Sequence, residues 1–102
     1  MNKYVAELYN QALTLVLDEF QLSADELFNS NVAECVQGRT SLIVGLHDLG
    51  VSDNDIAVCS QKLRRSSVCR IRNHYVAALA PWTVRHCLLH ISHLRPQREA
   101  VC

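Results

Sequence analysis

The sequence predicts an all-α domain of five to six helices, and three observations lead to that prediction. The chain has 102 residues, of which 49% are hydrophobic and 20% are charged, the composition of a single globular domain. Only three glycines and two prolines are available for the many tight turns of a strand-rich fold. Apolar residues recur at helical spacing, without the alternation of strands. We expect residues 1–94 to form one domain and residues 95–102 a polar tail.

The first fifty residues are expected to form three helices joined by short turns. Apolar residues at helical spacing predict the first helix over about Lys3–Phe20. Ser23 and Glu26 match a capping box, in which each side chain bonds a free amide at a helix start. This pair predicts a short second helix running through Phe28. A turn at residues 29–31 then leads to the third helix.

The third helix is expected over about Val32–Leu49, with an irregular start around Gly38. Gly50 would end it, because a residue without a Cβ is comfortable at positive φ. The last helix is expected over about Trp82–Leu94. Pro81 supports this boundary, since proline suits the first turn of a helix and breaks a helix interior.

Residues 52–76 are predicted to form a basic helix-turn-helix. Ser52, followed by an acid three residues later, would open a short helix through about Cys59. A turn at residues 60–62 would lead to a second helix over about Leu63–Ala77. A short helix, a tight turn and a longer basic helix form a unit that docks in the major groove of DNA.

The two faces of this predicted unit differ in chemistry. The core would receive the apolar side chains Ile56, Ala57, Leu63, Val68 and Ile71. The outer face of the second helix would carry the polar and basic residues Arg64, Arg65, Ser66, Ser67, Arg70 and Asn73. Cations in the first turn of a helix oppose its dipole unless an anion is present, so Arg64 and Arg65 favour a phosphate or guanine partner.

The net charge of zero conceals a strong polarity along the chain. Residues 1–56 contain nine acids and two bases, a net charge of −7. Residues 57–102 contain eight bases and one acid, a net charge of +7. The basic half would therefore meet an anionic partner first.

Several stretches match one known family: VLDEF at residues 16–20, DEL at 25–27, Arg39, LGVSDNDIA at 49–57 and RSSV at 65–68. Ala57 and Val68 lie eleven positions apart, one more than in most helix-turn-helix proteins. On these grounds residues 9–76 resemble the C-terminal DNA-binding domain (domain IV) of the bacterial replication initiator DnaA. That domain has six helices and is related to the Trp-repressor fold.

The resemblance implies that Arg65, Ser66 and Ser67 read bases in the major groove. It also implies that Arg39 contacts a phosphate or a base at the start of the long helix. Two departures limit it. Arg64-Arg65 replaces an Asp-His pair, so the preferred DNA sequence would differ. The basic loop that reaches the minor groove in the family is Asn29-Ser30-Asn31 here, which predicts weaker binding.

We therefore predict a protein that binds double-stranded DNA in transcription regulation or replication control. Phosphate contacts are expected from Arg39, Lys62, Arg70 and Arg72, and base contacts from Arg64, Arg65, Ser66 and Ser67. Catalysis and a cofactor are not expected, because the sequence contains no nucleophile elbow, no HExxH motif and no GxxxxGK[ST] loop. The alternative is a protein-interaction adaptor that has lost DNA binding and uses its acidic N-terminal helices.

The last predicted helix raises two further questions. Its broad apolar stripe could close the core or form the seam of a homodimer, and we favour the dimer because two-fold symmetry is usual for helix-turn-helix proteins. The stripe consists of Val84, Cys87, Leu88, Leu89, Ile91 and Leu94. Its polar face carries His86, His90 and His93, which could hold a transition metal. Without a carboxylate or a third ligand at a clear spacing, we expect no metal site. Trp82 is expected to anchor the core.

The remaining signals concern the compartment. Five cysteines at irregular spacing, with no CxxC pair, predict reduced thiols rather than a disulfide framework. The N-terminus lacks the basic and then apolar pattern of a signal peptide, and no apolar run approaches the roughly 20 residues of a membrane span. We therefore expect a cytoplasmic protein without membrane contact.

Overall fold

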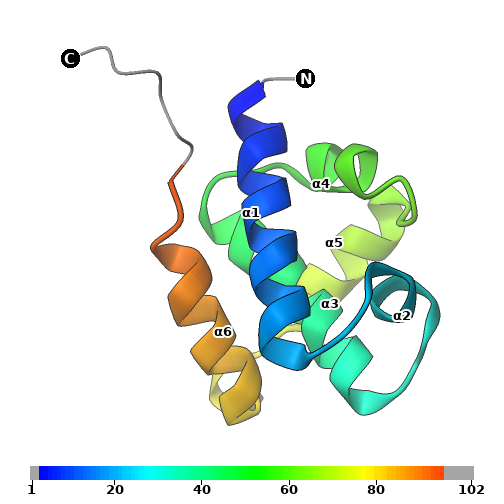
Figure 1. The fold of residues 1–102 in the computed structure, drawn as a ribbon, viewed down its shortest axis with the longest axis vertical. Helices are drawn as coiled ribbons and strands as arrows, with labels where there is room; N and C mark the ends of the chain where they lie inside the picture. The colour runs from blue at the N-terminus through cyan, green and yellow to red at the C-terminus, as the bar shows by residue number, and fades with distance from the viewer. Residues whose placement is uncertain (1–2, 96–102) are drawn as a thin grey trace.

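The long helix α3 (Ala33–Asp48) lies at the centre of the molecule, and five other α-helices pack around it (Figure 1). These helices belong to residues 3–95, the range that the computed structural model describes. Six consecutive residues of α3, 41–46, are buried, which a surface helix with one apolar face would not show. Ser41, the polar member of this run, donates its hydroxyl to the carbonyl of Gln37 at 2.9 Å. The all-α prediction is confirmed.

The first two helices form where their sequence signals predicted. Helix α1 spans Lys3–Phe20, and α2 spans Ala24–Asn29. The capping box before α2 is complete, since Ser23 Oγ accepts the amide of Glu26 at 3.1 Å and Glu26 Oε1 accepts the amide of Ser23 at 3.0 Å. After α3, Gly50 has a φ of 95°, as expected for the residue that ends a helix.

The irregularity predicted around Gly38 does not occur, and α3 is a regular helix through this residue. The glycine instead allows two helices to approach each other. A Cβ on Gly38 would lie 2.8 Å from Cδ1 of Leu27 on α2, which is closer than packed carbon atoms come. The missing side chain is therefore used for helix packing and does not break the helix.

Helix α4 spans Asp53–Ser60 and α5 spans Arg65–His74. Helix α5 is thus shorter than the predicted Leu63–Ala77. It ends at His74 because Tyr75 is extended, with φ −71° and ψ 127°. The chain then forms a single 3₁₀ turn, η1 (Ala77–Leu79), before the last helix.

Helix α6 (Trp82–Ser92) packs against α1 and α3 and closes the core. Of the apolar stripe that suggested a homodimer, Val84, Cys87 and Ile91 are buried and only Leu89 is largely exposed. The stripe therefore serves the core of this chain. Contrary to our expectation, Trp82 does not anchor the core. It is the first residue of α6, and it is 66% exposed.

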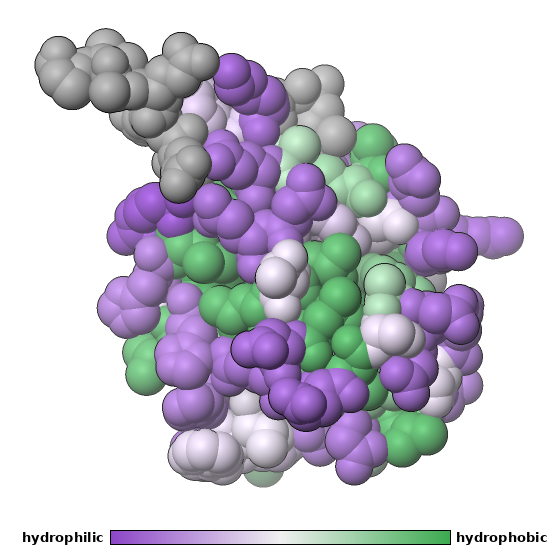
Figure 2. Space-filling model, viewed as in Figure 1, coloured by the Kyte–Doolittle hydropathy of each residue, from purple (hydrophilic) through white to green (hydrophobic). Residues whose placement is uncertain are grey.

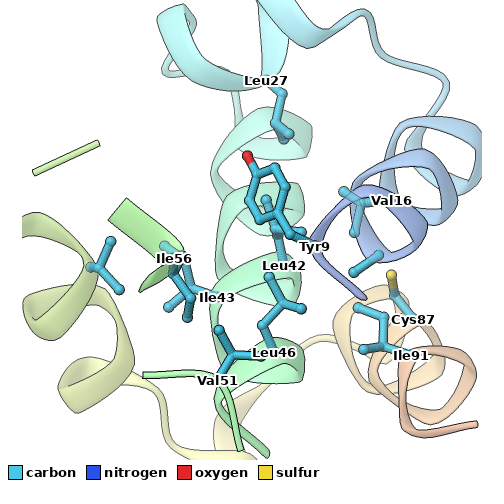
Figure 3. Packing of buried hydrophobic residues seen from close by; sticks show 12 residues of the cluster. Tyr9, Val16, Leu27, Leu42, Ile43, Leu46, Val51, Ile56, Cys87 and Ile91 are labelled. Carbon is cyan, nitrogen blue, oxygen red and sulfur yellow. The ribbon is translucent and has the colours of Figure 1, made fainter. Parts of the chain in front are cut away.

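The core consists of side chains from all six α-helices that converge on α3 (Figure 3). Tyr9 and Val16 enter it from α1, Leu27 from α2, and Cys87 and Ile91 from α6. Complete burial of a leucine or isoleucine side chain contributes about 1.5–3 kcal/mol, so this cluster is the main source of stability. The thiols of Cys35, Cys69 and Cys87 form no disulfide. Cys102 lies outside the described residues, as does most of the predicted tail.

Viewed from the side of α1, the surface is mostly hydrophilic, with apolar areas beside this helix (Figure 2). No helix within residues 3–95 combines the length and the apolar character needed to cross a membrane.

The closest approach of α6 to α3 yields the first prediction. A Cβ on Gly45 would lie 2.7 Å from Cγ2 and 2.8 Å from Cδ1 of Ile91. Ile91 is fully buried and branched at Cβ, so it cannot turn aside without repacking. Overpacking costs about 1–3 kcal/mol and the better helix propensity of alanine returns about 1 kcal/mol. We expect Gly45→Ala to lower the free energy of unfolding by up to about 2 kcal/mol in urea titrations followed by circular dichroism.

The control is the same substitution in an Ile91→Ala background, where the colliding atoms are gone. There Gly45→Ala should be neutral or stabilising. An equal loss in both backgrounds would show that the contact with Ile91 is not the reason why glycine is needed.

Candidate nucleic-acid interface

The connection between α4 and α5 is held by the side chain of Ser60. Its Oγ donates to the carbonyl of Ala57 at 2.9 Å and accepts the amides of Lys62 at 3.3 Å and Leu63 at 3.0 Å. Gln61 takes the left-handed conformation with φ 56° and so ends α4. These bonds keep the chain on a non-helical path through Leu63. For this reason α5 cannot begin at Leu63, as predicted, and begins two residues later.

The inner faces of α4 and α5 are packed as the sequence predicted. Ile56 and Val68 are completely buried, and Ala57, Leu63 and Ile71 are partly buried against the same core. Helix α5 also contacts α3. The orientation of its outer face is therefore fixed by the core.

Two arginines stand at the N-terminus of α5. Arg64 is the residue before the helix, and its carbonyl accepts the amide of Val68 at 3.0 Å. No side chain caps this helix end, although serine, threonine or aspartate commonly does so. Arg64, Arg65 and Ser66 are exposed, while Ser67 is partly buried. The positive end of the helix dipole thus coincides with two guanidinium groups, which is an arrangement that attracts anions.

Two further cations extend this positive surface. Lys62 is exposed in the turn, and Arg70 is exposed one helical turn beyond Ser66, on the same face of α5. In the part of the chain that the structure describes, Lys62, Arg64, Arg65 and Arg70 form no ion pair. We call these four residues the cationic face. Their charges remain available to an external anion.

Arg39 lies on α3, outside the cationic face, and binds the segment that follows α2. Its Nη1 donates to the carbonyls of Leu27 at 2.6 Å and Ser30 at 2.7 Å, and its Nη2 donates to Oδ1 of Asn31 at 3.2 Å. The guanidinium therefore binds the end of α2 and the following turn. We predicted that Arg39 contacts a phosphate. Its guanidinium would have to bind that phosphate while it keeps, or after it gives up, these hydrogen bonds.

Arg72 forms a two-point salt bridge with Asp53, which ties α5 to the first turn of α4. Nε lies 2.9 Å from Oδ1, and Nη2 lies 2.7 Å from Oδ2. The hydrogen bond from Arg72 lowers the pKa of Asp53, and the positive charge of Arg72 adds to this effect against partial desolvation. Arg72 would have to leave this carboxylate to make the phosphate contact that we predicted for it.

Two residues shape this region through contacts that were not predicted from the sequence. Ser60 carries a recognisable signal, because a serine beside a helix end often bonds the backbone of the following turn. The pairing of Asp53 carries no such signal, since nineteen residues separate it from Arg72. Only the packing of α4 against α5 brings the two side chains together.

The lowered pKa of Asp53 yields the second prediction. An aspartate whose pKa is lower in the folded than in the unfolded state stabilises the fold above its ordinary pKa of about 3.9. That stabilisation is lost as the pH falls through the folded-state pKa. We expect Asp53→Asn to unfold more easily than the wild type at pH 7. The difference in free energy of unfolding should shrink between about pH 5 and pH 2 in urea titrations.

Asp55→Asn is the matched control, because Asp55 lies in the same helical turn and does not bond Arg72. Its pH profile should follow that of the wild type more closely. If the free energy of unfolding of Asp53→Asn stays below that of the wild type by the same amount down to pH 2, the role given to the salt bridge is contradicted.

No family model, no curated protein and no solved structure matches this chain. A functional assignment therefore rests on the residues and contacts described above.

Proposed function

We propose that this chain binds double-stranded DNA through α5, in transcription regulation or replication control. One observation carries the proposal: Arg64 and Arg65 stand exposed at a helix N-terminus that no side chain caps. Two cations at the positive end of a helix dipole are unfavourable in the free protein. A phosphate or a guanine edge placed there would remove that cost and meet free amide donors as well.

The proposed docking places the N-terminal half of α5 in the major groove. This groove is about 12 Å wide and admits a helix whose first residues reach base edges. Arg64, Arg65, Ser66 and Ser67 would read bases there. Lys62 and Arg70 would contact phosphates on either side and set the register.

The local charges favour DNA over the adaptor alternative. An adaptor that has lost DNA binding would be expected to neutralise its arginines internally, with Asp53 and Asp55 as the nearest candidates. Asp53 instead forms a salt bridge with Arg72. Its charge also acts on Arg65, but within the described residues no carboxylate lies at ion-pair distance from the cationic face. The resemblance to domain IV of DnaA supports the same proposal. The turn at residues 29–31, which carries no cation, predicts no minor-groove contact.

The salt dependence of binding is the third prediction. Each neutralised phosphate contributes a slope of about −0.9 to a plot of log K against log salt concentration. If all four residues of the cationic face contact DNA, the slope should be about −3 to −4. Fluorescence anisotropy with a labelled duplex measures it. A complete lack of binding to a random duplex pool at low salt would sink the proposal and favour the adaptor.

The fourth prediction separates base reading from phosphate binding. Random-site selection on duplex DNA first supplies the preferred sequence. Arg65→Ala should then lose about 1–3 kcal/mol of discrimination at one base pair, or roughly 5- to 150-fold. Lys62→Ala should weaken binding to all sequences and reduce the salt slope by about 1.

Arg85→Ala provides the control for charge alone. Arg85 is exposed on α6, a helix that packs mainly on α1 and α3. Its removal should leave both preference and affinity nearly unchanged. If Arg65→Ala and Arg85→Ala weaken binding equally, the assignment of base reading to α5 is wrong.

A further inference from the structure

Three potential metal ligands meet between α1 and α6, two helices that lie side by side (Figure 1). Glu19 comes from the last turn of α1, and His86 and His90 lie one turn apart on α6. Oε1 of Glu19 is 3.3 Å from Nδ1 of His86, and Oε2 is 2.6 Å from Nδ1 of His90. One ligand atom from each residue lies within 4.8 Å of the other two.

From this cluster we infer a binding site for a divalent transition metal, with zinc as the best match. Two imidazole nitrogens and one carboxylate oxygen form the three-ligand set of many catalytic zinc sites. Calcium and magnesium prefer ligand sets made of oxygen alone, so this mixture disfavours them. Our sequence-based expectation of no metal site relied on the lack of a carboxylate. The fold supplies that carboxylate from 67 residues away.

The distances require little rearrangement. A tetrahedral ion with ligands at about 2.0–2.2 Å separates the ligand atoms by about 3.3–3.5 Å. The 3.3 Å between Glu19 and His86 lies in this range, and the 2.6 Å between Glu19 and His90 is shorter, so these two groups would move apart slightly. The largest separation within the group, at most 4.8 Å, exceeds the range by little more than 1 Å. Since the side chain of His90 is 45% exposed, a change of its rotamer can close the remaining gap.

Neighbouring side chains hold the ligands in place. The ring of His86 stacks on Trp82 with centroids 4.7 Å apart and contacts the ring of His90 edge-on at 4.3 Å. The side chain of Glu19 is only 21% exposed, so it is confined between the two helices. A hollow of about 240 Å³, lined by Glu19, Phe20, Trp82, Thr83 and His86, borders the site. It leaves room for water as a fourth ligand.

An ion held here would join the end of α1 to the middle of α6. Metal binding would then stabilise the packing of both helices against α3, because a ligand that binds only the folded state shifts the unfolding equilibrium. The site is independent of the cationic face, which lies on the turn and α5. Metal binding and DNA binding can therefore be tested independently of each other.

The fifth prediction is saturable 1:1 binding of Zn²⁺ to the full chain in isothermal titration calorimetry. His90→Ala and Glu19→Gln should each weaken it at least tenfold. Co²⁺ should give the intense visible absorption of a tetrahedral site. It should also quench the fluorescence of Trp82, the sole tryptophan, which stacks on His86. Zn²⁺ should also raise the melting temperature of the wild type and raise that of His90→Ala much less.

His93→Ala is the matched control, because His93 directly follows α6 but is not one of the three ligands. It should bind Zn²⁺ as the wild type does, and so should Arg65→Ala. Circular dichroism establishes that His90→Ala is folded before its affinity is compared. The proposal is overturned if Zn²⁺ does not bind. It is also overturned if His90→Ala binds Zn²⁺ as tightly as the wild type, which would place the ion on other residues such as the cysteines.

Discussion

The burial of residues 41–46 of α3 on all sides is the constraint on which the rest of the structure depends. Every other α-helix packs against it, so its position sets theirs. Gly38 and Gly45 permit the closest approaches, to α2 and to α6 respectively. An added Cβ at Gly38 would collide with Leu27 and one at Gly45 with Ile91, so either change would force a buried side chain to repack. The outer face of α5 and the cluster of Glu19, His86 and His90 are both oriented through this one helix.

Local signals predicted the fold well because the helix ends have side-chain chemistry that acts at short range. The capping box at Ser23 and Glu26 and the positive φ of Gly50 are determined by residues within one turn. Helix α5 was predicted too long, since the bonds of the Ser60 hydroxyl delay its start. The positions of Arg39, Arg72 and Glu19 could not be predicted. Each is set by contacts between elements far apart in the sequence, and a cation's residue type does not reveal which acceptor folding will offer it.

Five arginines thus divide into two groups with opposite electrostatic surroundings. Arg39 and Arg72 satisfy carbonyls and a carboxylate inside the molecule, where they fix loops and helices. Arg64, Arg65 and Arg70 are left to the solvent. This division explains how a chain with a formal net charge of zero can present a local surface of one sign. The salt bridge with Arg72 also engages Asp53, an acid that would otherwise compete with an external anion.

The turn at Ser60 has a consequence for how such a protein can diversify. Its hydroxyl and the buried Ile56 and Val68 hold α5 from beneath, while the side chains of Arg64, Arg65 and Ser66 take no part in that support. Substitutions at exposed positions outside such networks change stability by only about 0.5 kcal/mol. Descendants of this chain can therefore exchange these three residues freely without endangering the scaffold. The DNA preference proposed for α5 can therefore change while the fold stays constant.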